Sequence, residues 1–213
     1  VRLPESTDFA EGACLGIPAM TAWYALFGSG DDLKGKTVLV TGGAGSVGRY
    51  ACQMASLAGA KVITTVSSSE KAKHSGVSDW VNYQSDDVVE GVFEKNGGKS
   101  VDLIVDVDFA ANQDVSLALL RPGGVIAAYA SASNQTPDLQ FYPLMFRDIT
   151  LRMLICYQIA PETRRRAEAQ ITDWLEEGAL SHAVVDGGSL EDVAKAHEAV
   201  EAGKKLGTVV LTL

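Results

Sequence analysis

The residues with the clearest chemical potential are the glycines in the segment 41-TGGAGSVGRY-50. Gly43, Gly45 and Gly48 have the spacing G-x-G-x-x-G, and Gly42, Gly45 and Gly48 have the related spacing G-x-x-G-x-x-G. Glycines spaced in this way permit a tight turn, let the backbone approach a pyrophosphate, and allow a helix to pack closely on a strand. The N–H groups at the start of that helix would add positive charge for the anion. The turn therefore predicts a site for the diphosphate of a nucleotide.

The context of the turn makes a dinucleotide the favoured ligand. The apolar segment 36-KTVLV-40 comes directly before the turn, and the helical segment 49-RYACQMASLAGA-60 follows it. This order of strand, glycine turn and helix is the context that the motif requires. Two alternatives stay open: a glycine-rich turn without a ligand, and another nucleotide-like ligand such as a methyl donor.

The end of the next predicted strand, 64-TTVSSSEK-71, indicates which dinucleotide is preferred. An NAD-binding protein usually has Asp or Glu there to hold the ribose 2′-hydroxyl. Here the strand ends in serines, Ser67 among them, and Lys71 follows shortly after. Hydroxyls and a lysine suit a 2′-phosphate, which a carboxylate would repel. We therefore expect NADP(H) rather than NAD. The alternative is that these serines only cap a helix and that Lys71 is solvated.

The turn also fits T-G-x-x-G-x-x-G, the pattern of extended short-chain reductases and sugar-nucleotide epimerases. Those enzymes resemble one another in a Y-x-x-x-K pair that moves a proton. No tyrosine of this chain has a lysine four residues later; the tyrosines are Tyr24, Tyr50, Tyr83, Tyr129, Tyr142 and Tyr157. That family is therefore disfavoured.

The elements that must position these residues alternate between strand and helix. Predicted strands are 37–42, 61–66, 80–83, 102–107 and 124–130, with predicted helices near 46–58, 69–75, 86–95 and 112–120. The strands are nearly all apolar rather than alternating, which is typical of strands covered on both faces. Alternation with helices predicts right-handed crossovers and a Rossmann-type α/β fold, a doubly wound parallel sheet with helices on both faces.

Further elements are expected on either side of this core. Predicted helices are 18–28, with Pro18 in its first turn and Gly28 at its end, then 162–177 and 189–203; predicted strands are 149–157, 182–186 and 208–213. The net charge of −9 argues against a nucleic-acid partner. The short apolar runs predict no membrane span. Three widely spaced cysteines predict no structural metal site and a reduced, cytoplasmic compartment.

Taken together, several segments resemble the zinc-independent medium-chain dehydrogenases/reductases, specifically the quinone oxidoreductase (ζ-crystallin-like) group. They are 2-RLPESTDFAEGACLGIPAMTAWYAL-26, GGAGSVGRYACQMASLAGAKV, 80-WVNY-83, 121-RPGG-124 and 190-LEDVAKAHEAVEAG-203 followed by GTVVL. The resemblance covers essentially the whole chain. It implies an NADPH-dependent oxidoreductase that transfers a hydride to a quinone or an α,β-unsaturated carbonyl, and a homodimer formed through the sixth strand.

The resemblance also implies positions for the cofactor. The catalytic acid or base stays unassigned, because solvent or the missing domain could supply the proton, and no metal ligand is expected. The pyrophosphate would lie against the turn, the 2′-phosphate near two predicted strand ends, adenine or ribose near a third, and the nicotinamide near the remaining residues. In that order, the cofactor-binding residues are Gly42, Gly43, Ala44, Gly45, Ser46 and Val47; Ser67, Lys71 and Tyr83; Val107; and Thr21, Ser131, Ile155 and Cys156. Thr208 stands where the family often has lysine.

The family has a mostly β, GroES-like substrate domain before the residues that match Val1. We therefore expect a truncated chain in three parts: residues 1–33 as a first helix and remnant of the catalytic domain, 34–160 as the dinucleotide-binding domain, and 161–213 as closing helices and a strand that returns to the catalytic domain. Without that domain the strand 208–213 would be an unpaired apolar edge. The alternative functions are a non-catalytic nucleotide-binding or structural module and a relative of alcohol dehydrogenase that lacks its zinc lobe.

Overall fold

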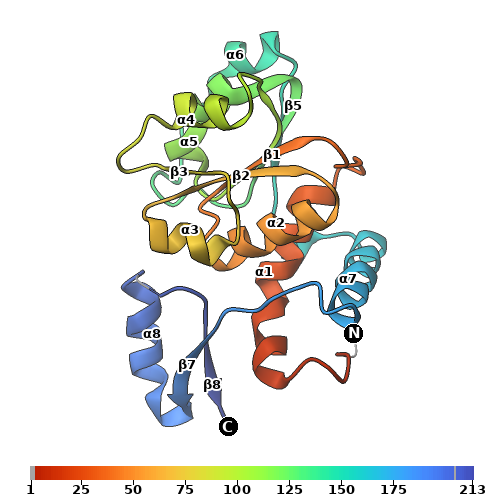
Figure 1. Ribbon diagram of the computed structural model, residues 1–213, viewed down its shortest axis with the longest axis vertical. Helices are drawn as coiled ribbons and strands as arrows, with labels where there is room; N and C mark the ends of the chain where they lie inside the picture. Colours follow the sequence, from red (N-terminus) through yellow and green to blue (C-terminus); the bar gives the residue numbers. More distant parts are fainter. Residues whose placement is uncertain (1–2, 204) are drawn as a thin grey trace.

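The computed structural model describes residues 3–203 and 205–213, so Val1 and Arg2 of the resembling segment and Lys204 lie outside the described residues. Its main feature is a parallel six-stranded sheet with the order β3-β2-β1-β4-β5-β6 (Figure 1). The strands are β1 (Thr37–Thr41), β2 (Lys61–Val66), β3 (Trp80–Asn82), β4 (Val101–Asp106), β5 (Leu120–Ala128) and β6 (Thr150–Met153). This is the strand order of the dinucleotide-binding fold, and it confirms the predicted fold class.

Helices cover both faces of this sheet. They are α1 (Phe9–Phe27), α2 (Ser46–Leu57), α3 (Ser69–Ser75), α4 (Val88–Lys95), α5 (Phe109–Leu119), α6 (Phe141–Phe146) and α7 (Pro161–Glu176). Along β1, Val38 and Val40 belong to the core shared with α1, α2 and α7, whereas Leu39 belongs to the core shared with α4 and α5. Successive side chains of a strand point to opposite faces, so a strand buried on both sides must be apolar throughout.

The first helix differs from its prediction. It begins at Phe9 rather than at residue 18, because Asp8 and Glu11 form a capping box at its N-terminus. Pro18 therefore lies inside the helix, close to a kink at Gly16, whose backbone angles are not helical. The predicted end at Gly28 is confirmed.

Other boundaries also shift. The sixth strand ends at Met153, and a short 3₁₀ helix, η1 (Cys156–Gln158), replaces the last part of the predicted strand 149–157. Helix α5 begins three residues before its predicted start at position 112, and β5 begins at Leu120 instead of position 124. The short helix α6 was not predicted from the sequence.

The C-terminal residues form a small separate sheet. Strand β7 (Val184–Ser189) is followed by a 3₁₀ turn, η2 (Leu190–Asp192), then by α8 (Val193–Glu201) and β8 (Thr208–Thr212), and β8 pairs in parallel with β7. In Figure 1 this unit lies below the main sheet, beside the lower end of α1. The prediction of an unpaired strand at 208–213 is therefore wrong for one of its two edges, because β7 covers it. Among the described residues, no helix is long and apolar enough to cross a membrane.

Candidate cofactor-binding site

Most of the predicted cofactor residues lie along one edge of the main sheet. All six strands are parallel, so the loops after them emerge at the same edge. Following the strand order from β3 to β6, these loops carry Tyr83, Ser67, the turn from Gly42 to Val47, Val107, Ser131, and then Ile155 with Cys156. Thr21 does not follow a strand; it lies in α1, where it is buried. The fold thus brings residues from six separate loops to a common edge.

The glycine turn between β1 and α2 has the compact shape that its spacing predicts. Gly42 adopts a φ of +68°, a left-handed conformation that favours glycine. The N–H group of Gly45 donates a hydrogen bond of 2.9 Å to the carbonyl oxygen of Gly42. A Cβ atom on Gly48 would overlap that same carbonyl oxygen and would lie 2.9 Å from Cα of Gly43. Gly48 therefore allows the helix to begin directly against the turn.

The N-terminus of α2 is available to an anion. Gly45 is its N-cap residue and is exposed, and within residues 3–203 and 205–213 no side chain caps this helix end. The first turn contains no acidic residue. The first N–H groups of a helix have no partner within the helix, and they carry the positive end of its dipole. The N–H groups of Ser46 and Val47 thus have the environment that a phosphate requires.

The loop after β2 separates the two roles that its serines could play. Ser68 is the N-cap of α3, and its Oγ accepts a hydrogen bond of 3.2 Å from the N–H group of Lys71. Ser67 precedes the cap and directly follows β2. Within the part of the chain that the structure describes, no carboxylate forms an ion pair with Lys71. Tyr83, from the neighbouring strand end, is 51% exposed. Capping therefore accounts for Ser68 but not for the hydroxyl of Ser67.

The ends of β1 and β4 lie side by side in the middle of the sheet. From β1 the chain adds β2 and β3 on one side, and from β4 it adds β5 and β6 on the other. Val107 lies over the glycine turn, since a Cβ atom on Gly42 would be 3.1 Å from Cγ1 of Val107. Beneath it lies Asp106, a fully buried carboxyl group that the sequence analysis did not single out. Burial raises the pKa of Asp106, although hydrogen bonds from Asn112, Asp108 and Thr41 oppose the shift. The available signal was an aspartate at the end of the apolar run 102-DLIVDV-107.

The loops after β5 and β6 form the other end of this edge. The Oγ of Ser131 donates a hydrogen bond of 2.6 Å to the carbonyl oxygen of Asn134, and it accepts one of 3.3 Å from the N–H group of Ala110. The side chain of Ile155 is 52% exposed, whereas Cys156 is buried. The structure therefore fixes Ser131 between its own loop and the start of α5.

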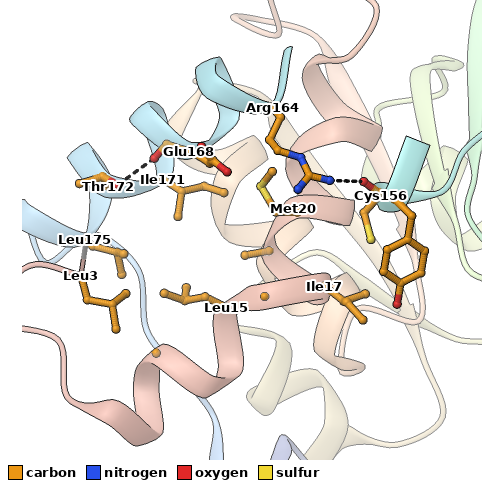
Figure 2. Close-up of a pocket in the computed structure, with 14 residues that line it drawn as sticks. Leu3, Leu15, Ile17, Met20, Cys156, Arg164, Glu168, Ile171, Thr172 and Leu175 are labelled. Carbon is orange, nitrogen blue, oxygen red and sulfur yellow. Dashed lines mark hydrogen bonds between the residues drawn. The ribbon is translucent and has the colours of Figure 1, made fainter. Parts of the chain in front are cut away.

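A largely apolar cavity of about 500 Å³ lies beside Cys156, between α1 and α7 (Figure 2). Its lining includes Leu15, Ile17, Met20, Cys156, Ile171 and Leu175. The side chain of Arg164 lies at one end, where its Nη2 donates a hydrogen bond of 3.4 Å to the carbonyl oxygen of Cys156. A cavity of this volume and polarity is typical of sites for small organic molecules.

The comparisons with known proteins agree with this geometry. Residues 46–176 match the family model described as zinc-binding dehydrogenase. The chain belongs to this family.

Three relatives of this zinc-binding dehydrogenase chain illustrate the match. A quinone oxidoreductase from Pongo abelii is 30% identical over all of this chain and 65% of its own length. The Escherichia coli quinone oxidoreductase solved with NADPH is 25% identical, with a TM-score of 0.88 over all of this chain and 68% of that one. A 2-haloacrylate reductase is 29% identical, with a TM-score of 0.88 over 100% and 69% of the two chains. The predicted kinship with quinone oxidoreductases is thereby confirmed, and the chain spans about two thirds of the length of these relatives.

The family name raises the question of zinc. In residues 3–203 and 205–213, no group of three or more His, Cys, Asp or Glu side chains is arranged to hold a metal ion. Cys14, Cys52 and Cys156 are separate, buried thiols. Burial raises the pKa of Cys52 to about 12, which disfavours the thiolate that zinc binds. The residues described here do not fit a zinc site, so no step is assigned to zinc.

Proposed function

We propose that this chain is the cofactor-binding portion of an NADPH-dependent oxidoreductase. The observation that carries the proposal is the glycine turn with the uncapped, exposed N-terminus of α2 behind it. The E. coli relative that was solved with NADPH supports the choice of cofactor. When bound, NADPH supplies the hydride of the reaction, and the protein binds and orients it.

The residues along the sheet edge would each contact a different part of this cofactor. Gly42, Gly43, Ala44, Gly45, Ser46 and Val47 would bind the pyrophosphate, since they form the turn and the helix start. Ser67, Lys71 and Tyr83 would surround the 2′-phosphate, and Val107 would contact the adenine or its ribose. Thr21, Ser131, Ile155 and Cys156 would line the nicotinamide end. Hydroxyl and ammonium donors at the 2′-phosphate give charge-assisted hydrogen bonds, which are stronger than neutral ones.

The acceptor of the hydride would be a quinone or an α,β-unsaturated carbonyl compound. Two relatives are named as a quinone oxidoreductase and a 2-haloacrylate reductase. Quinones and 2-haloacrylates both contain an electron-poor carbon–carbon double bond. The apolar cavity beside Cys156 would accept the hydrocarbon part of such a substrate and exclude water from it. This chain supplies the cofactor side of the site; the remaining third of the relatives' length would supply the rest of the substrate pocket.

The wider proposals concern the whole protein. We infer that residues 34–160 are the dinucleotide-binding unit and that residues 1–33 and 161–213 belong with a second domain. We also infer that two copies of the protein pair through β6. The protein would act without zinc and in the cytoplasm. Strand β6 lies at the edge of the main sheet, and the thiols are free, as a reducing compartment requires.

A second function is supported by the length comparison. The chain spans 65% of the Pongo abelii relative, so it could bind NADPH without turning it over, as a nucleotide-binding or structural module. Measuring quinone-dependent oxidation of NADPH alongside NADPH binding separates the two proposals. Tight binding without turnover favours the module, whereas turnover favours the enzyme.

The cofactor proposal is tested by changing Lys71 and titrating NADPH and NADH by fluorescence. Lys71→Ala should weaken NADPH binding about tenfold, because a charge-assisted bond to phosphate is lost. NADH lacks the 2′-phosphate, so its affinity should not change. Lys73→Ala is the matched control, since Lys73 lies on the same helix and is exposed. Equal losses for NADPH and NADH, or equal effects of the two variants, would contradict the assignment.

A further inference from the structure

The buried carboxyl group of Asp106 lies at the carboxyl edge of the sheet, next to the glycine turn proposed to bind the cofactor. Asp106 is the last residue of β4 and its side chain is fully buried. The order in which the chain adds strands to the sheet reverses between β1 and β4. Ligands of this fold bind at the carboxyl ends of the strands at that point. Burying a carboxyl group costs free energy unless hydrogen bonds replace its lost hydration. The hydrogen-bond partners of Asp106 therefore show which segments it holds in place.

One oxygen of Asp106 holds three segments together. Its Oδ1 accepts hydrogen bonds from Oγ1 of Thr41 at 2.9 Å, from Nδ2 of Asn112 at 2.7 Å and from the N–H group of Asp108 at 3.1 Å. Thr41 is the last residue of β1, next to the glycine turn, and Asn112 lies in the first turn of α5. The carboxyl group thus joins the end of β1, the loop after β4 and the start of α5.

The same network fixes the residues that face the cofactor. Oγ1 of Thr41 accepts a hydrogen bond of 2.9 Å from the N–H group of Val107, so the hydroxyl that donates to Asp106 also holds the next loop. Val107 in turn contacts the turn at Gly42. The other oxygen of Asp106, Oδ2, is buried and has no partner among the described residues.

We propose that Asp106 is a positioning residue for the cofactor: it acts through Thr41 and Val107 to hold the glycine turn and the loop after β4 at the separation that NADPH requires. The inference rests on the proposed cofactor function. Because the side chain of Asp106 is fully buried, it is expected to affect the binding of NADPH through the positions of the glycine turn and the loop after β4 rather than through chemistry.

The chain contains a matched control at the opposite end of the same two strands. Asp102 also joins β4 to β1, because its Oδ2 accepts a hydrogen bond of 2.8 Å from the N–H group of Thr37, and its Oδ1 pairs with Arg121 at 2.6 Å. Asp102 and Thr37 lie at the amino ends of these strands, away from the glycine turn. Loss of either aspartate removes a link between the strands, but only Asp106 lies at the cofactor edge.

The experiment measures thermal stability and NADPH affinity for wild type, Asp106→Ala, Asp106→Asn and Asp102→Ala. Asp106→Ala should weaken NADPH binding about tenfold or more, as misplaced positioning groups commonly do. Asp106→Asn keeps an oxygen that can accept the same three hydrogen bonds, so it should restore the affinity to within about twofold of wild type. Asp102→Ala should lower the melting temperature but leave the affinity unchanged.

The outcomes distinguish this inference from the function on which it rests. If wild type does not bind NADPH, the proposed function fails and the positioning role fails with it. If wild type binds and Asp106→Ala binds equally well, or if Asp106→Ala and Asp102→Ala weaken binding to the same extent, the positioning role alone is overturned. If Asp106→Ala does not fold, Thr41→Val decides: it removes the linking hydroxyl, and unchanged affinity for NADPH in that folded variant overturns the role.

Discussion

The glycines of the turn have different physical tasks, although their spacing alone does not separate them. A Cβ atom on Gly43 would overlap the side chain of Thr64, and one on Gly48 would overlap the backbone of Gly42. Gly45, in contrast, is exposed, and its φ of −74° is accessible to any residue. Gly43 and Gly48 are thus required by contacts within the protein, whereas Gly45 leaves the backbone open to a ligand.

This difference predicts that two alanine variants will lose different amounts of stability. Gly48→Ala should destabilise the protein by about 1–3 kcal/mol, because backbone atoms must move to admit the methyl group. Gly45→Ala should cost no more than about 1 kcal/mol, the preference for glycine over alanine at a helix N-cap. Gly45→Ala should nevertheless weaken NADPH binding, because Gly45 is the exposed N-cap of α2, and a Cβ atom there would lie 3.3 Å from the carbonyl oxygen of Gly42 and so disturb the turn proposed to bind the pyrophosphate. Urea denaturation and NADPH titration check both; equal stability losses would contradict the division of roles.

Asp106 predicts a pH dependence whose sign follows from its burial. Burial raises the pKa of Asp106 above 3.8, its ordinary value, so the folded protein binds this proton more tightly than the unfolded chain does. The ionised group therefore lowers stability at neutral pH, and this loss is reversed as pH falls through the folded-state pKa. Relative to Asp106→Asn, wild type should become more stable on acidification, at pH values above the ordinary pKa.

The measurement is the free energy of unfolding of both proteins across that pH range. Other carboxyl groups with lowered pKa, such as Asp192, are present in both variants and cancel in the difference. A difference that does not vary with pH would show that Asp106 is not shifted in the folded state.

At the scale of the elements, α1 and α7 pack together on one face of the sheet. The ring centroids of Trp23 and Phe27 in α1 lie 5.4 Å apart, and Phe27 lies 6.1 Å from Trp174 in α7. Nε1 of Trp23 donates a hydrogen bond of 2.6 Å to Oε1 of Gln170 in α7. Trp174 belongs to the same core as β1, so α7 contributes to the stability of the dinucleotide-binding unit.

Trp174→Ala should therefore destabilise the whole unit by about 3–5 kcal/mol, as expected for loss of a buried aromatic side chain. Leu190→Ala is the control, because Leu190 is 53% exposed in the 3₁₀ turn η2 and should change stability by no more than about 0.5 kcal/mol. Chemical denaturation followed by circular dichroism measures both. A small effect of Trp174→Ala would show that α7 docks only weakly.

At the scale of the whole molecule, one edge of the main sheet is open and apolar. Among the described residues, strand β6 has a partner only on the side of β5. Exposed side chains accompany it: Met153 on the strand itself, and Phe146 in α6 just before it. An open strand edge with apolar neighbours can pair with the same strand of a second copy, and a two-fold axis would make the contact self-complementary. This geometry supports the proposed homodimer.

Met153→Lys should convert that dimer into a monomer, because the pairing would bury the ammonium group of each copy in an apolar interface. Val184→Lys is the control, since Val184 is also an exposed strand residue but lies in the small sheet. Sedimentation velocity at several concentrations measures the outcome. A wild-type protein that stays monomeric at high concentration would contradict pairing through β6.

The sequence by itself determined the parallel sheet and the glycine turn, because both depend on local or periodic features. A strand buried on both faces is mainly apolar, as the centres of β1 and β4 are, and a turn such as that at Gly42 needs glycine whatever surrounds it. The capping box of Asp8 and Glu11 is also a local sequence pattern. The predicted start of α1 was nevertheless placed at Pro18, because proline favours the first turn of a helix.

Only the tertiary structure decided which distant residues meet. Asp106 and Thr41 are 65 positions apart, and their hydrogen bond exists because β1 and β4 become neighbours in the sheet. The cavity beside Cys156 likewise depends on α1 and α7, from opposite ends of the chain. Buried polar links and cavities depend on how complete elements pack, and neither propensity nor spacing along the chain contains that information.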